Sequence, residues 1–156
     1  MNIRRAEISD TKSIIKLLKQ VNNVHNAVRP DLFIKDKTKY TENELIEILK
    51  NDKTPVFVAV DDNENVVGYC FGIFCSHEKD NNFPDITTFY IDDLCVDENS
   101  RGKHTGKALY DYAVNFAREN GCYNLTLNVW SGNDTAIKFY ENQGLKIQKY
   151  GLETIL

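Results

Sequence analysis

The segment from residue 92 to residue 109 combines residue types that could bind an anion. An apolar strand ending at Val96 is followed by a turn with glycines at positions 102 and 106, and then by a helical pattern. The first amides of a helix have no partner within the helix, and the helix dipole adds partial positive charge, so this turn can bind a phosphate group. The alternative is that the glycines only connect two elements. The same turn contains three cations: Arg101, Lys103 and Lys107.

The spacing of these glycines argues against two common nucleotide-binding motifs. In a P-loop, Lys-Ser or Lys-Thr follows the second glycine, whereas here Gly106 is followed by Lys107 and Ala108. The Gly-x-Gly-x-x-Gly dinucleotide motif is not matched either. Nucleotide hydrolysis and hydride transfer are therefore disfavoured, and a nucleotide-binding regulatory domain stays an alternative.

Length and charge restrict the classes of protein further. The 156 residues contain no repeat or linker, which predicts a single domain over residues 1–156. A formal net charge of −4 disfavours nucleic acid as a partner. No run of about 18 apolar residues indicates a membrane span, and the first residues lack the apolar core of a signal peptide. We therefore expect a cytoplasmic protein.

The cysteines and histidines do not form a recognisable metal site or disulfide framework. The cysteines, at positions 70, 75, 95 and 122, are irregularly spaced, and the histidines, at 25, 77 and 104, are scattered. We expect free thiols and no bound metal.

Hydrophobic periodicity predicts an α/β fold with a mixed sheet that contains an antiparallel meander of three consecutive strands. The expected elements are, in chain order, a strand over residues 2–6, a helix capped by Ser9, a long loop over residues 22–40, a helix begun by a capping box at Thr41–Glu44, strands over residues 56–60, 66–75 and 86–96, a helix ending near Gly121, a strand over residues 124–130, a short helix from Asn133 to Gly144, and a last strand over residues 145–150.

The turn Arg101-Gly102-Lys103-His104-Thr105-Gly106 resembles the signature of the GNAT superfamily of acetyl-CoA-dependent N-acetyltransferases. That signature is Arg or Gln, two residues, Gly, one residue, then Gly or Ala; this chain matches at both ends and has His104 at the middle glycine position. Residues 3–10 resemble the family's first strand and cap, and residues 133–145 its late helix with a Phe-Tyr pair and a glycine stop. The resemblance implies a GNAT-like fold: a mostly antiparallel sheet, splayed at the parallel strands 92–96 and 124–130 and flanked by about four helices.

The resemblance also implies where acetyl-CoA binds as co-substrate. Backbone groups of Leu94, Cys95 and Val96 pair with the pantetheine arm, and the helix-terminal turn holds the pyrophosphate. Asn133 is implied to hydrogen-bond the cofactor, although the same side chain can cap its helix. The other residues implied to bind acetyl-CoA are Arg101, Gly102, Lys103, His104, Thr105, Gly106, Lys107, Ala136, Phe139 and Tyr140.

Acetyl transfer requires a neutral amine, so a base must remove a proton. Adjacent strand residues point to opposite faces, and therefore only one of Asp92 and Asp93 is expected to face the cleft. The resemblance favours Asp92 as the base, because it matches a glutamate position in some polyamine-acetylating members of the family. Asp93 is kept as an alternative base or orienting residue, and both could instead be structural. The resemblance implies that Tyr140 is the general acid that protonates the CoA thiolate, with a core aromatic as the alternative. Cys95 has no histidine placed to activate it and is interpreted as a structural thiol.

The resemblance implies that the acceptor binds at the loop between the first two helices and at the strands of the hairpin. Aromatic groups and carboxylates suit a cationic amine, whereas Arg29 suits an acceptor with a carboxylate, and core packing is the alternative for each aromatic. Polyamines, peptide amines, amino acids and aminoglycosides all stay open, and a catalytically silent acyl-CoA sensor is the alternative function. The candidate acceptor-binding residues are His25, Arg29, Phe33, Tyr69 and Phe71.

The last residues, 151–156, are rich in apolar side chains. They are expected either to extend the sheet or to pair with a second copy of the chain, and we expect a homodimer.

Overall fold

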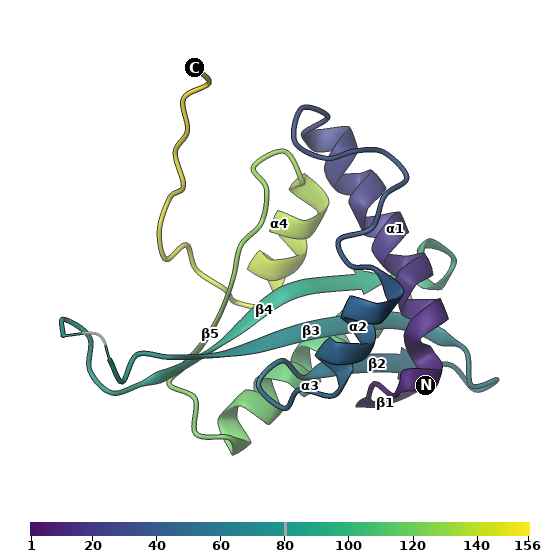
Figure 1. Cartoon of the computed structure of the whole chain (residues 1–156), viewed down its shortest axis with the longest axis horizontal. Helices are drawn as coiled ribbons and strands as arrows, with labels where there is room; N and C mark the ends of the chain where they lie inside the picture. The colour runs from purple at the N-terminus through teal and green to yellow at the C-terminus, as the bar shows by residue number, and fades with distance from the viewer. Residues whose placement is uncertain (80) are drawn as a thin grey trace.

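The computed structural model describes residues 1–79 and 81–156, which form a five-stranded sheet with helices on both faces (Figure 1). The strands lie in chain order; the first four are antiparallel to their neighbours, and the last is parallel to the fourth. This arrangement confirms the predicted mixed sheet. The strands are β1 (Asn2–Arg5), β2 (Val56–Val60), β3 (Val66–Ser76), β4 (Thr87–Val96) and β5 (Asn124–Leu127).

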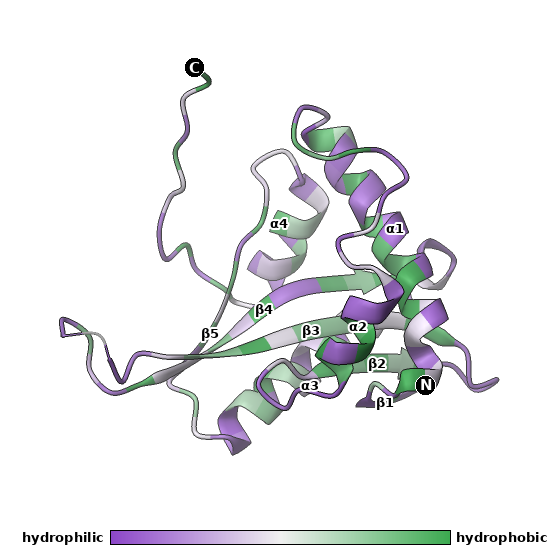
Figure 2. Ribbon diagram, viewed as in Figure 1, coloured by the Kyte–Doolittle hydropathy of each residue, from purple (hydrophilic) through white to green (hydrophobic). Residues whose placement is uncertain are grey.

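Two hydrophobic clusters, one on each side of the sheet, form the core. The helices are α1 (Thr11–Val28), α2 (Glu42–Leu49), α3 (Thr105–Glu119) and α4 (Asp134–Asn142). Ile14 and Leu17 of α1 and Leu45 of α2 pack in one cluster, whereas Leu109 and Ala113 of α3 pack in the other. Figure 2 shows the result: hydrophobic residues fill the central strands, and hydrophilic residues gather on the outer faces of the helices.

Strand β2, which lies between β1 and β3, explains why both faces of the sheet are covered. All its residues are buried. Val56, Val58 and Val60 belong to the α1 and α2 cluster, whereas Phe57 and Ala59 belong to the α3 cluster. A strand that is apolar at every position needs cover on both faces, so β2 forces the three-layer arrangement.

The beginning of α1 differs from the prediction. Ser9 does not cap this helix; instead, the carboxylate of Asp10 accepts a hydrogen bond from the Glu7 amide at 2.8 Å and pairs with Arg4 at 2.7 and 2.9 Å. The ion pair between β1 and the helix entry replaces the cap. The helix also continues to Val28, which shortens the expected loop.

The predicted start of α2 and the predicted ends of α3 and α4 are confirmed, whereas the strand predicted over residues 124–130 ends at Leu127. The capping box of Thr41 and Glu44 begins α2. Gly121 and Gly144 follow α3 and α4 with φ values of 71° and 84°, which are conformations that glycine adopts without strain.

The end of the chain was predicted wrongly. Residues 145–150 were expected to form a strand, but no residue after Asn142 belongs to a helix or strand. None of the helices in the described ranges is long and apolar enough to cross a membrane.

Candidate functional site

The predicted site lies where β4 and β5 separate. β5 pairs with β4 only from Thr88 to Ile91, whereas β4 continues to Val96 and is paired there with β3 alone. The chain after β5 turns away from β4, and α4 lies beside the region of separation (Figure 1). Residues 92–96 therefore keep one backbone edge that no strand of the described chain covers, as predicted for the strand that binds an extended arm.

The turn before α3 presents free donors. The amides of Thr105, Gly106 and Lys107 donate to no acceptor within residues 1–79 and 81–156. Lys107 pairs with Asp111 at 2.6 Å, but Arg101 and Lys103 form no ion pair with any described residue. Helix-terminal amides beside uncompensated cations form a site that a phosphate group can occupy.

His104 occupies a position that demands an unusual backbone. Its φ and ψ are 62° and 11°, in the left-handed region. The signature carries glycine at this position, and the conformation explains that preference because glycine adopts positive φ at no steric cost. His104 keeps the turn geometry despite its side chain, so the departure from the signature leaves the free amides in place.

Helix α4 brings Tyr140 toward the same region. A Cβ built on Gly106 would lie 3.4 Å from the ring of Phe139, so this ring packs against the first turn of α3. The neighbouring Tyr140 packs edge-on against Phe139, with ring centroids 5.1 Å apart. Burial raises the pKa of Tyr140, which keeps its phenol protonated. The side-chain oxygen of Asn133 caps α4 by accepting from the Ala136 amide at 3.2 Å, which leaves the side-chain NH₂ group of Asn133 available to a ligand.

The two aspartates do not lie as predicted. A register shift between Phe71 and Gly72 leaves Asp92 without a partner on β3, which is a β-bulge. The hydroxyl of Tyr40 donates to Asp92 at 3.1 Å, and that of Tyr69 donates to Asp93 at 2.8 Å. Both tyrosines pack against Phe71 in the α1 and α2 cluster. The prediction of opposite faces is wrong because the bulge breaks the alternation of the strand.

Asp93 has the perturbed titration expected of a candidate base. Burial raises its pKa to about 6, although the hydrogen bond from Tyr69 favours the ionised form. A carboxyl group that titrates near neutral pH can accept and release a proton under ordinary conditions.

The carboxylate of Asp92 binds Lys39 and Tyr40, two residues that were not predicted from the sequence. The Lys39 ammonium lies 2.6 Å from its Oδ2. Burial is the largest single effect and lowers the pKa of Lys39, but the hydrogen bond and the charge attraction to Asp92, with smaller attractions from Tyr40 and Asp93, together raise the pKa above its ordinary value. Lys39 and Tyr40 come from the loop before α2, about fifty positions earlier in the chain. Nothing in their local sequence signals this contact.

A second cluster gathers at the loop after α1. The ring of Phe33 lies between those of His25 and Trp130, with centroid distances of 5.0 and 5.6 Å. Arg29 lies over the Trp130 ring at 5.6 Å and pairs with Asp31 and Glu153. Burial lowers the pKa of His25. The sequence indicated His25, Arg29 and Phe33 but not Trp130, which lies just beyond β5.

The remaining residues that were considered as site residues, Tyr69, Phe71 and Cys95, are buried in the core. Tyr69 is fully buried and reaches the site only through its hydroxyl, and Phe71 is 3% exposed. The thiol of Cys95 lies 3.7 Å from the carbonyl oxygen of Leu17, and burial raises its pKa to about 12. This environment supports the structural interpretation of Cys95, because the thiolate is the nucleophilic form.

Comparison with known proteins identifies the family. Residues 21–145 match the model of the Acetyltransferase (GNAT) family. The chain belongs to the GNAT family. It is 26% identical to the peptidyl-lysine N-acetyltransferase YjaB of Salmonella typhimurium over 148 residues, which are 94% of this chain and 84% of that protein.

Solved structures share the GNAT architecture. A mutant of the BH1408 protein from Bacillus halodurans superimposes with a TM-score of 0.94 and 28% identity, covering 100% of this chain and 99% of that chain. The aminoglycoside N-acetyltransferase AAC(6')-Iy in complex with CoA gives a TM-score of 0.72 at 15% identity, covering 99% of this chain and 98% of that chain. These structures share the fold of this chain, and the family match shows that the protein is an acyltransferase.

GNAT acetyltransferases use acetyl-CoA. The groups present in this structure fit that co-substrate: the free α3 amides and unpaired cations suit its pyrophosphate, and the unpaired edge of β4 suits its peptide-like arm.

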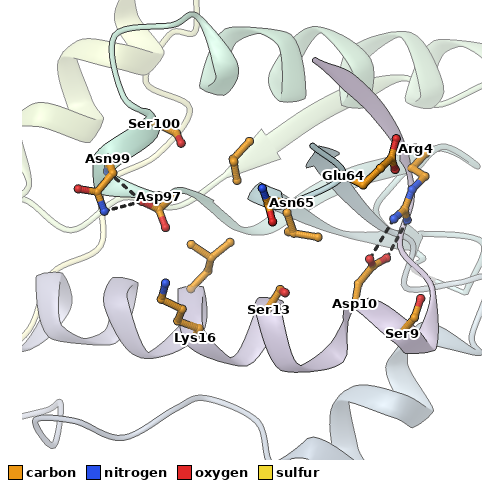
Figure 3. A pocket seen from close by; sticks show the side chains of 13 residues that line it. Arg4, Ser9, Asp10, Ser13, Lys16, Glu64, Asn65, Asp97, Asn99 and Ser100 are labelled. Carbon is orange, nitrogen blue, oxygen red and sulfur yellow. Dashed lines mark hydrogen bonds and ion pairs between the residues drawn. The ribbon is translucent and has the colours of Figure 1, made fainter. Parts of the chain in front are cut away.

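A half-open pocket lies outside the predicted site. It has a volume of about 650 Å³ and is lined by the start of α1, the turn between β2 and β3, and residues 97–100 (Figure 3). Arg4 and Asp10, which both line the pocket, form an ion pair with one another. The carboxylate of Asp97 accepts a hydrogen bond from the Asn99 amide. None of the predicted site residues lines it.

Proposed function

We propose that this GNAT acetyltransferase acetylates a primary amine that binds as an ammonium ion beside Asp92. The proposal rests on the ion pair between Lys39 and Asp92. Asp92 directly follows Ile91, the last residue of β4 that pairs with β5. Lys39 Nζ is itself a primary ammonium, so the carboxylate already binds the chemical group that an acceptor would present. An incoming amine takes the place of Lys39, whose side chain is 48% exposed and can move into solvent.

Acetyl-CoA binding is assigned to the opposite side of the region where β4 and β5 separate. When bound, acetyl-CoA supplies the thioester that carries the transferred acetyl group. The amides of Thr105–Lys107, with Arg101 and Lys103, hold the pyrophosphate, and the backbone of Leu94–Val96 holds the arm. The side-chain NH₂ group of Asn133, together with Ala136 and Phe139, contacts acetyl-CoA from α4.

Two residues are assigned to proton transfer. Asp93, with its pKa of about 6, takes up the proton that the ammonium must lose before it can act as a nucleophile. Asp92 is then the binding partner of the ammonium, which divides the roles differently from the sequence-based preference. Tyr140 holds its proton at neutral pH because burial raises its pKa, and this proton is available to the sulfur that leaves.

The charge arrangement narrows the acceptor class. Arg29 is the candidate that would suit an acceptor carboxylate, but its guanidinium is already paired with Asp31 and Glu153. A lysine side chain in a peptide, or a polyamine, is therefore favoured over a free amino acid. The relative YjaB is a peptidyl-lysine N-acetyltransferase, which supports the lysine side chain as the first acceptor to test.

The test is a turnover screen with acetyl-CoA and a panel of lysine peptides, polyamines, aminoglycosides and amino acids, with products identified by mass. We expect lysine peptides or polyamines to be acetylated fastest. If acetyl-CoA raises the melting temperature of the protein but no amine in the panel is acetylated, the proposal is wrong and the sensor alternative is supported.

A variant tests the acid. Tyr140→Phe should lower kcat about 100-fold, which is typical for loss of a general acid, and leave the KM for acetyl-CoA nearly unchanged. Tyr123→Phe, at a residue that is 73% exposed on the approach to β5, is the matched control and should retain full kcat. Equal kcat in the two variants would remove Tyr140 from the mechanism.

A further inference from the structure

The side chain of Gln20 connects helix α1 to the end of β4. Its Nε2 donates to the Val96 carbonyl at 3.0 Å and lies 3.5 Å from the Cys95 sulfur, and its Oε1 accepts from the Glu98 amide at 3.2 Å. One end of the carboxamide faces a carbonyl and the other faces an amide, so only this orientation satisfies both groups. A single side chain therefore binds both the last residue of β4 and the start of the turn that follows it.

The packing of α1 fixes the position of this side chain. Gln20 lies three positions after Leu17, which is 1% exposed, so both residues lie on the face of the helix that packs on the sheet. The end of β4 reaches α1 at this point (Figure 1). Gln20 is itself partly buried, and its carboxamide lies between two packed elements.

The Val96 carbonyl belongs to the edge of β4 that β5 leaves open. The Asp97 amide donates to the Val67 carbonyl of β3 at 2.9 Å. Consecutive residues of a strand direct their backbone groups to opposite edges, so the N–H and C=O of Val96 face away from β3. The arm of acetyl-CoA is assigned to this edge. Gln20 therefore binds the carbonyl of Val96, whose amide faces the same edge and can donate to the arm.

The second contact of Gln20 reaches the segment that leads to the pyrophosphate. Glu98 begins a short 3-10 turn, Glu98–Ser100, and Arg101 follows this turn directly. The arm and the pyrophosphate are parts of one molecule, so both bind well only when the strand and the turn keep a fixed relative position. Gln20 is hydrogen-bonded to both segments.

We propose that Gln20 is a positioning residue for acetyl-CoA. Its carboxamide holds the end of β4 and the turn before α3 in the relative position that lets one molecule pair with both. The inference rests on the proposed placement of acetyl-CoA at β4 and α3. A site that is ordered before binding loses less entropy when the ligand arrives, so the affinity depends on Gln20 without a direct contact between this side chain and the ligand.

The variant Gln20→Met tests the inference, because it removes both hydrogen bonds and nearly keeps the length of the side chain. We expect the Kd of the full-length protein for acetyl-CoA, measured by isothermal titration calorimetry, to rise about tenfold. Asn22→Ala is the matched control, since the Asn22 carboxamide donates from the same helix to the Ile34 carbonyl at 2.7 Å, in the loop before α2. This control should bind acetyl-CoA like the parent.

A second variant, Gln20→Glu, separates positioning from a loss of packing. Near pH 8 the new carboxylate can accept from the Glu98 amide but cannot donate to the Val96 carbonyl, so the Kd should again be about tenfold higher than that of the parent. Near pH 5 the carboxyl group begins to take up a proton, and its O–H can then donate to Val96. The ratio of the two Kd values should therefore fall as the pH is lowered, whereas the ratio for Gln20→Met should stay constant.

The parent is measured at every pH, because Asp93, Asp97 and Arg101 act electrostatically on the adjacent Cys95 and are common to all the proteins. Urea unfolding shows whether each variant is folded under the conditions of the titration. A Kd for folded Gln20→Met within about twofold of the parent, or a Gln20→Glu ratio that does not change with pH, would overturn this inference alone. A parent that binds no acetyl-CoA would overturn the proposed function as well.

Discussion

The two sides of the region where β4 and β5 separate present different chemical groups to a ligand. The side toward α3 offers backbone amides and two cations that have no partner in the described chain. The side toward the loop before α2 offers two carboxylates, and each already has a partner from this chain, Lys39 or Tyr69. The groups of the first side are free to bind a ligand. On the second side, the acceptor must compete with the protein's own side chains for the carboxylates. This difference has consequences for stability, for binding of each substrate and for what the sequence reveals.

The largest expected effect concerns the partly buried carboxylate of Asp93. Its pKa is about 6 in the folded protein and near 3.8 without burial, so the folded state resists ionisation. Stability from this group is present below pH 4 and is lost as the pH rises toward 6. Asp93→Asn keeps an acceptor for Tyr69 and removes the titration. The variant should therefore gain stability relative to the parent as the pH rises from 4 to 7, by up to about 3 kcal/mol. Urea unfolding at each pH measures it.

Tyr69→Phe is the opposing variant for the same site. It removes the hydrogen bond that favours ionised Asp93, so the stability of this variant should fall more steeply with pH than that of the parent. Parallel curves of unfolding free energy against pH for all three proteins would show that Asp93 does not titrate in this range.

The next largest effect is expected on acetyl-CoA binding at the side toward α3. Arg101→Ala/Lys103→Ala removes both unpaired cations, and the KM for acetyl-CoA should rise about tenfold with little change in the KM for the amine. The variant should also lose most of the salt dependence of acetyl-CoA binding. Lys12→Ala/Lys16→Ala changes the net charge equally on the exposed surface of α1 and should leave both values unchanged. An equal increase for both substrates would contradict the division into two sides.

A smaller effect is expected where the acceptor competes with Lys39. Lys39→Met frees Asp92, so the KM for the amine should fall about threefold, which corresponds to an ion pair that is half exposed. The KM for acetyl-CoA should not change. Lys50→Met, which breaks a comparable pair with Glu47 on α2, is the matched control. A higher KM for the amine in Lys39→Met would show that Lys39 assists the acceptor instead of competing with it.

The same difference explains what the sequence could predict. The side toward α3 depends on one contiguous motif, and its amides follow from the existence of a helix, so Arg101–Lys107 could be located without a structure. The strands of the meander and the caps at Thr41 and Asn133 were predicted for the same reason: their signals are local.

The other side depends on contacts between distant segments. The bulge at Asp92 arises from the register between β3 and β4, and it reverses the expected orientation of a carboxylate. Lys39 reaches Asp92 from a loop whose path only the packed fold determines. The strand predicted over residues 145–150 is absent because a sequence shows that a segment suits a strand but not which sheet edge pairs with it.

The smallest effect sharpens the comparison, because it tests whether the side toward α3 depends on its backbone rather than on its side chains. His104 has a φ of 62°, which costs a non-glycine residue about 1 to 2 kcal/mol. His104→Gly relieves this strain, but glycine gives the unfolded chain more freedom, which costs about 0.5 to 1 kcal/mol. The two effects nearly cancel, and the variant should be more stable by about 0.5 kcal/mol in urea unfolding. Its KM for acetyl-CoA should equal that of the parent, since the amides of Thr105–Lys107 keep their positions. A KM that rises several-fold would instead make the imidazole of His104 a binding group, and the side toward α3 would then depend on a side chain that the family signature replaces with glycine.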